Sequence, residues 1–264
     1  MVRTLIGLIL VAAIFAGLGA LGWYFVKERV RLQQNYRLSA DKIVVSPQPP
    51  DWIPERFVED VLRRSGMEPT TSLLDKTLPQ RLAEAFATHP WVENVEQVVL
   101  RHPSGAYVQL SYRVPTALVE IPQKGIFPVD RNGIVLPLEY VLDAAADRRS
   151  EHLVIQGIQT MPLGSEGTPW GDPLVQTAAQ LAEALTDIAK PLNLARIIPA
   201  MEAIPGGTRI ECRLQTDGGT EFRWGSFVPD DPKIETKKKK LWDLHDRFRS
   251  LDNVPAEFRD LRGE

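Results

Sequence analysis

The stretch TLPQRLAEAFATHPWVENVEQVVLRHPSGAYVQLSYRV, residues 77–114, decides the fold of the first half of the chain. It begins with a Thr-x-x-Gln capping box at Thr77, followed by apolar residues three and four positions apart, and this pattern predicts a helix. Residues 95–102 and 106–114 then alternate between apolar and polar side chains, as strands do. Residues 103–105, Pro-Ser-Gly, separate these strands, so the sequence predicts a helix followed by a β-hairpin.

Two more elements are predicted before this stretch. Residues 36–45 have the pattern of a strand that ends at a cluster of prolines. Residues 55–65 have the pattern of a helix with one apolar face, and Gly66 follows as its end signal. The order is therefore strand, helix, helix, strand, strand. We expect residues 36–114 to form a small module in which two helices cover one face of a sheet.

Beyond Pro115 the sequence predicts short strands and two long helices. One helix begins after Asp172, which is followed by proline at the first helical position, and ends before Pro191. A second helix is predicted over Lys233–Leu251. The predicted strands cover residues 117–121, 126–129, 134–137, 154–158, 208–215 and 220–224, and residues 256–262 are a candidate for a last strand. We expect residues 115–264 to form a mixed β-rich module with covering helices.

The N-terminal residues differ from the rest of the chain. Residues 4–26 contain no charged side chain, and a helix of this length rises about 34 Å, enough to cross a hydrocarbon core of about 30 Å. The sequence therefore predicts a transmembrane helix over residues 4–26, after a short tail, residues 1–3, and before a juxtamembrane stalk, residues 27–35. A cleaved signal peptide is the alternative. Basic residues flank both ends, and they leave the orientation undecided.

The composition is that of an ordinary globular protein, with 44% hydrophobic and 25% charged residues in 264. There are 31 Lys and Arg against 34 Asp and Glu, for a net charge of −3, which argues against a strongly basic nucleic-acid-binding protein. The single cysteine, Cys212, excludes an internal disulfide framework and a four-cysteine zinc site. We therefore expect no nucleic-acid partner.

No motif of catalysis or cofactor binding is found. The sequence contains no GxSxG and no phosphate-binding loop, and its one GxGxxG match, residues 17–22, lies inside the apolar stretch 4–26 and not between a strand and a helix as a dinucleotide site requires. The four histidines are not at metal-ligand spacing: His89, His102, His152 and His245. Residues 130–133, Asp-Arg-Asn-Gly, favour a hairpin turn over a calcium loop. The lysine run 237–240 favours a solvated helix surface. We predict no catalytic residue, no cofactor, no metal, no small-molecule substrate and no enzyme activity.

Several stretches resemble, in their order and spacing, the FtsQ/DivIB family of bacterial cell division proteins. They are HPWVENV at 89–95 with the strand at 98–103, RVPTA at 113–117, VDRNGIVL at 129–136, KLWDL at 240–244 and DLR at 260–262. Members of this family have one membrane helix, a POTRA domain and a β domain. The resemblance thus implies an α+β fold with an N-terminal transmembrane helix, a POTRA-like β-α-α-β-β module at 36–114 and an FtsQ/DivIB-like β domain at 115–264.

The resemblance also implies a function. The chain would be a non-catalytic, membrane-anchored divisome scaffold that links FtsB/DivIC-like and FtsL-like proteins and helps regulate septal peptidoglycan synthesis. It would lie in the bacterial inner membrane at the division site, with residues 1–3 as a short cytoplasmic tail and most of the chain on the periplasmic or extracytoplasmic side. Two alternatives stay open: a POTRA-bearing anchor for another envelope-assembly or secretion process, and a membrane-tethered enzyme.

The partner site is expected at the last strand. An exposed strand edge offers unpaired backbone groups to which a partner strand can add. Outward-facing arginines on the late hairpin and this strand would present a basic face to partner carboxylates. The predicted partner-binding residues are Arg209, Arg213, Arg223, Arg259, Asp260, Leu261 and Arg262.

Overall fold

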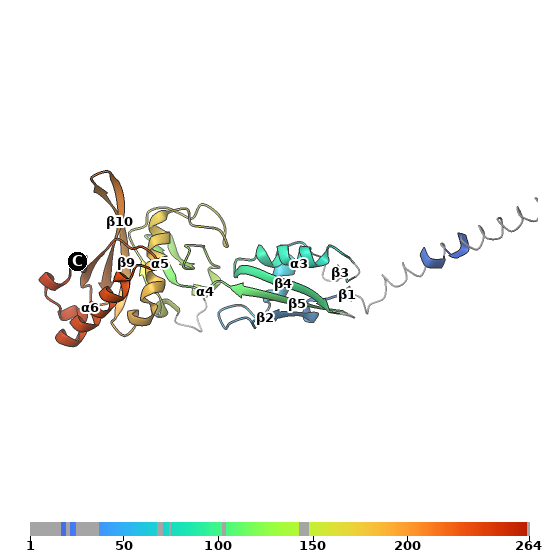
Figure 1. Ribbon diagram of the computed structural model, residues 1–264, viewed down its shortest axis with the longest axis horizontal. Coiled ribbons are helices and arrows are strands. Elements are labelled where there is room, and N and C mark those ends of the chain that lie inside the picture. The colour runs from blue at the N-terminus through green and yellow to red at the C-terminus, as the bar shows by residue number, and fades with distance from the viewer. Residues whose placement is uncertain are drawn as a thin grey trace, which may run out of the picture. The chain divides into compact units, whose positions relative to one another are not determined.

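The computed structural model describes residues 17–19, 22–24, 37–67, 71–73, 75–101, 104–142 and 148–262. The chain divides into two compact units, with the boundary between Ser111 and Tyr112 (Figure 1). The sequence predicts this boundary at Pro115. Each unit has its own sheet and its own covering helices, and the fold is mixed α+β.

The first unit is built on a three-stranded sheet. Its strands are β2 (Ile43–Ser46), β4 (Val92–Arg101) and β5 (Gly105–Tyr112), in the order β2-β5-β4, and β2 runs parallel to β5. A separate antiparallel pair joins β1 (Arg37–Leu38) to β3 (Thr71–Ser72). Alternate residues of β5 are buried, as its sequence pattern predicts.

Two helices, α2 (Phe57–Arg64) and α3 (Leu78–Ala87), add buried residues to the core of the first unit. The rings of Phe57 and Phe86 meet edge to face at 5.9 Å between centroids. The apolar stripe predicted for the second helix is confirmed, because these residues are buried: Leu78, Leu82, Ala85 and Phe86. This packing lets a small sheet bury one face.

Two local predictions in the first unit are wrong. The strand predicted at residues 36–45 is interrupted by a 3₁₀ turn at Ala40–Lys42, because the Lys42 N–H donates to the Ser39 carbonyl at 3.0 Å. The capping box at Thr77 does not form. The Thr77 N–H and hydroxyl both donate to Asp75 Oδ1, at 2.9 and 2.8 Å, so the aspartate closes a turn before the helix begins.

The second unit is built on a six-stranded sheet with the order β11-β10-β9-β8-β6-β7. The strands β6, β8 and β9 run parallel, and the other neighbours are antiparallel. The bounds are β6 (Ala117–Ile121), β7 (Gly125–Val129), β8 (Leu153–Ile155), β9 (Leu194–Ile204), β10 (Gly207–Thr216) and β11 (Glu221–Gly225). The strands β9 and β10 form a long hairpin that extends beyond the rest of the sheet (Figure 1), and residues 200–209 are exposed on it.

The sequence did not predict strand β9, the longest in this sheet. Its Pro199 cannot donate a hydrogen bond, which normally argues against an inner strand. The structure resolves this: Ile197 points its carbonyl to the β8 side, where it accepts from the Gln156 N–H at 2.9 Å. The backbone groups of successive residues point to opposite sides of a strand, so the nitrogen of Pro199, two residues after Ile197, also points to the β8 side. The pairing between β8 and β9 ends at Ile197, so this nitrogen has no strand opposite it. No ladder hydrogen bond is lost there.

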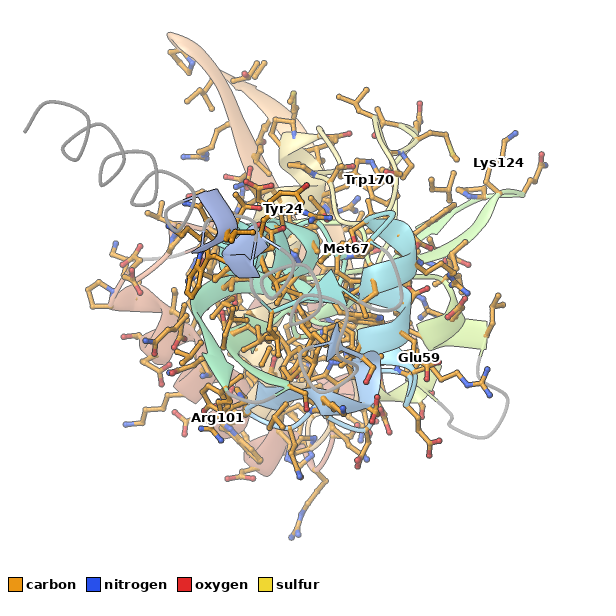
Figure 2. All side chains as sticks on the ribbon, turned by 90° about the vertical axis from the view of Figure 1, so that its right-hand side faces the viewer. Tyr24, Glu59, Met67, Arg101, Lys124 and Trp170 are labelled. Carbon is orange, nitrogen blue, oxygen red and sulfur yellow. The ribbon has the colours of Figure 1, made fainter. Side chains whose placement is uncertain are left out.

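Two helices cover the second sheet. Helix α5 (Pro173–Ala189) packs on β9, β8 and β6, and the Asp172 side chain accepts from the Leu174 N–H at 2.9 Å, as its cap pattern predicts. Helix α6 (Lys233–Phe248) buries Leu241 and Leu244. Shorter helices are α4 (Glu139–Leu142) and the 3₁₀ turns η3 (Arg148–Glu151), η4 (Leu251–Asn253) and η5 (Ala256–Phe258). Trp170, which Figure 2 labels, is 1% exposed in this core.

The turn predicted at residues 130–133 is confirmed. The Asp130 carbonyl accepts from the Gly133 N–H at 2.9 Å, and Gly133 has a φ of +71°. The buried Asp130 carboxylate accepts from the N–H groups of Asn132 and Ile134, at 2.8 and 2.9 Å, and from Arg113 Nη1 at 2.8 Å. Its oxygens are thus held by the protein itself, and this part of the motif has a structural role.

The predicted transmembrane helix at residues 4–26 is corrected by the structure. A crossing needs about 20 apolar residues in one helix, and nowhere in the described part of the chain is a helix both long and apolar enough to cross a membrane. The structure describes only 17–19 and 22–24 of this stretch, and the rest of it, the tail 1–3 and the stalk 27–35 lie outside the described residues. The single-pass location in the bacterial inner membrane is corrected with it.

Candidate partner-binding site

The terminal segment Arg259–Arg262 adds to the edge of the second sheet through one parallel bridge, between Arg223 of β11 and Asp260. The Arg223 N–H donates to the Arg259 carbonyl at 2.9 Å, and the Leu261 N–H donates to the Arg223 carbonyl at 2.8 Å. The longer strand predicted at residues 256–262 is wrong. Its first three residues form η5 instead, where the Arg259 N–H donates to the Ala256 carbonyl at 3.3 Å.

The segment is anchored by Leu261, which is 1% exposed and belongs to the hydrophobic core. This residue was predicted to contact a partner, but its side chain is used inside the unit. Strand β11 ends at Gly225, whose φ is +88°. A Cβ there would lie 2.8 Å from Cγ of Arg262, so glycine leaves the space through which the Arg262 side chain passes.

The outer edge of this segment is not fully open. Residues 259 and 261 bond to β11, so the backbone groups of Asp260 and Arg262 point away from it. On that side Lys240 Nζ donates to the Asp260 carbonyl at 3.1 Å. The Arg262 N–H donates to Asp260 Oδ1 at 3.0 Å. Two backbone groups that a partner strand could use are therefore bonded to side chains of this chain.

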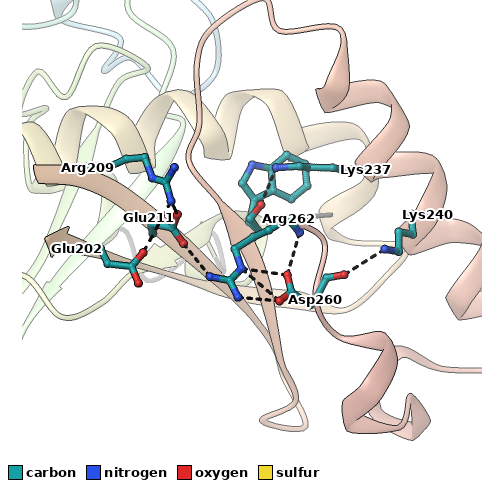
Figure 3. Close-up of polar contacts among 8 residues, drawn as sticks. Glu202, Arg209, Glu211, Lys237, Lys240, Asp260 and Arg262 are labelled. Carbon is teal, nitrogen blue, oxygen red and sulfur yellow. Dashed lines mark hydrogen bonds and ion pairs between the residues drawn. The ribbon is translucent and has the colours of Figure 1, made fainter. Parts of the chain in front are cut away.

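An Asp260–Arg262 ion pair lies at the centre of the candidate site (Figure 3). The guanidinium donates through Nε to Asp260 Oδ1 at 3.1 Å and through Nη2 to Oδ2 at 2.8 Å. Its Nη1 lies 3.6 Å from Glu211 Oε2. The hydrogen bonds from the Arg262 side chain and N–H lower the pKa of Asp260 to about 2, and the same contact raises the pKa of Arg262.

Two other arginines of the predicted face, Arg209 and Arg213, also have carboxylate neighbours. Arg209 pairs with Glu211 and lies 4.0 Å from Glu202, its cross-strand partner. Arg213 pairs with Glu221 at 3.0 Å. The predicted basic face is thus a surface of mixed charge. Exposed ion pairs of this kind contribute about 0–1 kcal/mol each, so a partner's charge can replace them at small cost.

Two predicted residues stand apart from this network. Arg223 is exposed, lies opposite Arg213 in the β10–β11 register, and has no carboxylate within 4 Å among the described residues. Arg259 donates through Nε to the Val254 carbonyl at 2.7 Å, which fixes the turn before the terminal segment. The structure therefore brings Arg209 and Arg262 together around Glu211. Arg223 has no close ion pair, although its charge helps to lower the pKa of Asp260.

Sequence reasoning missed Lys237, because the run 237–240 was interpreted as a solvated surface. Lys237 is half-buried, donates to the Trp224 carbonyl at 2.6 Å and lies 4.9 Å from the centre of the Trp224 ring. Burial lowers the pKa of Lys237. Helical spacing was the available signal, because Lys237 lies four residues before Leu241 and seven before Leu244, on the buried face.

A cavity of about 370 Å³ opens beside these residues. Its lining includes Arg209, Glu211, Gly225, Lys233, Lys237 and Arg262. Its volume is within the range of small-ligand sites. Over the described residues, no group of three or more His, Cys, Asp and Glu side chains is arranged to hold a metal ion.

Cys212 lies in β10 near this cavity but is 1% exposed. Burial raises the pKa of its thiol to about 12, so the thiolate needed for nucleophilic chemistry is scarce at neutral pH.

The chain was compared with models of known protein families and with curated proteins, and neither comparison finds a match. The resemblance to the FtsQ/DivIB family therefore stays a prediction from the motifs of the sequence.

Proposed function

We propose that this chain is a non-catalytic scaffold of the bacterial cell division machinery, which binds FtsB/DivIC-like and FtsL-like proteins and so helps regulate septal peptidoglycan synthesis. The sequence motifs suggest the family. The observation that carries the proposal is the edge of the second sheet, where the terminal segment is held to β11 by one bridge and surrounded by exchangeable ion pairs.

The mechanism is the addition of a partner strand at this edge. Backbone hydrogen bonds supply affinity in such complexes, and side chains fix the register. The partner would displace Lys240 from the Asp260 carbonyl and would pair with the arginines of the surface. Arg223 is the residue best placed to meet a partner carboxylate, because its charge is not already neutralised by an ion pair among the described residues.

The first unit supports the same proposal in a general way. Its mixed three-stranded sheet and two helices follow the strand-helix-helix-strand-strand order expected of a POTRA-like module. The same unit favours the second candidate, a POTRA-bearing component of another envelope-assembly or secretion process. The two candidates differ in the partner that the chain captures.

The experiment is co-purification of the full chain with an FtsB/DivIC-like and FtsL-like pair from the same organism. Arg223→Glu reverses an exposed charge without disturbing the core, and we expect it to weaken capture by about tenfold, as loss of a charged contact does. The matched control is Lys124→Glu, at the turn that leads into β7, the far edge of the same sheet (Figure 2). Capture that is absent with the unaltered chain, or equal for both variants, would contradict the proposal.

A further inference from the structure

The cavity beside α6 is lined by more cationic than anionic side chains. Arg209, Lys233, Lys237 and Arg262 line it, and the carboxylates on its wall are Glu211 and Asp231. Cations thus outnumber carboxylates by two to one.

Both carboxylates already have partners. Asp231 Oδ1 accepts from the Lys233 N–H at 2.9 Å, which caps the start of α6. Glu211 pairs with Arg209 and lies 3.6 Å from Arg262. Arg262 is also paired with Asp260, which lies outside the lining. Four cations therefore face three carboxylates (Glu211, Asp231 and Asp260), and one positive charge remains at the cavity.

Lys237 holds much of that charge. Its ammonium group has three donors, and one of them is used by the Trp224 carbonyl. The described residues place no carboxylate within 4 Å of it, although the side chain is half-buried. Removing an unpaired charge from water is costly, and the carbonyl and the Trp224 ring offset only part of this cost. An anion in the cavity would supply the missing partner.

The position of the cavity indicates where such an anion comes from. Strand β11 pairs with β10 only over Cys212–Gln215, so in the described structure the outer edge of Gly207–Glu211 has no neighbouring strand. The cavity borders this edge through Arg209 and Glu211. An extended segment that binds along this edge of β10 has side chains that point alternately to its two sides. The side chains on one side point toward the cavity.

We propose that this cavity is an anion-binding socket, in which Lys237, Lys233 and Arg262 take a carboxylate side chain from a partner segment that binds along the free edge of β10. The inference rests on the proposed function, since the segment belongs to the captured partner. It adds residues of α6 to the site and specifies an acidic residue on the partner.

The first experiment titrates the full chain with the pentapeptide acetyl-Thr-Val-Glu-Val-Thr-amide, with its Gln twin and with inorganic phosphate, at constant ionic strength. The ¹³Cε resonance of Lys237 is the readout. We expect the Glu peptide to shift this resonance and to raise the pKa of Lys237, and the Gln peptide to leave both unchanged. Equal shifts with both peptides would overturn the socket. Phosphate binding as tight as that of the Glu peptide would overturn the assignment to a strand-borne carboxylate.

The second experiment compares two variants of neighbouring lysines. We expect Lys237→Gln to weaken binding of the Glu peptide by about tenfold, the usual effect of losing a charge-assisted hydrogen bond. Lys239→Gln removes an exposed charge from the same helix, outside the cavity lining, and we expect less than about twofold loss. Lys237→Arg keeps the charge and should retain most of the affinity. Equal binding by the Lys237→Gln and Lys239→Gln variants, with thermal unfolding unchanged, would overturn the socket.

Capture of the FtsB/DivIC-like and FtsL-like pair separates the two proposals. If the Glu peptide binds but the FtsB/DivIC-like and FtsL-like pair is not captured, the anion-binding socket is supported and the proposed partner is rejected. Capture that Lys237→Gln does not weaken leaves the partner in place and rejects the socket.

Discussion

Replacing Leu261 by alanine tests whether the terminal segment is an integral part of the second unit. The side chain is 1% exposed and lies in the core cluster. Alanine lacks three of its buried carbons, and at about 0.8 kcal/mol for each the loss is about 2.4 kcal/mol. The cavity left behind brings the expected destabilisation to about 2–5 kcal/mol.

Amide hydrogen exchange in β10 and β11 measures this loss in the second unit alone. A decrease of about 2.4 kcal/mol in the free energy of unfolding corresponds to exchange about 50-fold faster in the most protected amides. The control is Leu163→Ala, because Leu163 is 84% exposed; we expect a change of less than about 0.5 kcal/mol there. A loss below about 1 kcal/mol for Leu261→Ala would refute the reasoning, because the segment would then detach without disturbing the core.

Three further predictions concern other parts of the structure. Burial lowers the pKa of His89, so below about pH 6.5 the unfolded chain binds a proton at this residue more readily than the folded chain does. The free energy of unfolding, measured with urea, should therefore fall from pH 7 to pH 5, and it should fall less in the His89→Gln variant. Gly218→Ala puts a Cβ 2.5 Å from Cγ of Asp252 and should cost about 1–3 kcal/mol, whereas Gly207→Ala, with open space around it, should be nearly neutral in thermal unfolding. Arg262→Glu puts a third carboxylate beside Asp260 and Glu211; carboxyl ¹³C NMR should show the pKa of Asp260 rising, and an unchanged pKa would contradict the pairing.

The parts of the fold set by local patterns were predictable. The alternation in β5 gives its buried face, and Asp172 with the proline after it gives the start of α5. The parts set by tertiary contacts were not. Pro199 is compatible with β9 only because β8 has already ended beside it, and no local pattern contains that information. The failed capping box at Thr77 has a similar cause, since the competing acceptor, Asp75, lies outside the motif.

The strands that carry the arginines of the candidate site were predictable, but the contacts of these arginines were not. The sequence indicated which strands carry arginines, but the carboxylates that pair with them come from neighbouring strands or alternate positions, as Glu211 does for Arg209 and Arg262. Leu261 shows the same limit: two charged residues flank it, and only the packed sheet reveals that it points into the core. Lys237 was missed because the run of four lysines was interpreted as a whole, without asking which of them shares the buried side of α6 with Leu241 and Leu244.

The burial of Leu261 in a core shared with residues of β6 has a consequence for the order of events during synthesis. Ala117 and Leu261 belong to one cluster, although more than 140 residues separate them along the chain. A ribosome adding about 5–20 residues per second needs several seconds or more to cover that interval. Strand β11 ends 36 residues before Leu261, so in the last part of this interval its edge lacks the segment that covers it, and unpaired strand edges are prone to wrong pairing. The second unit therefore acquires its complete core only after Leu261 has left the ribosome.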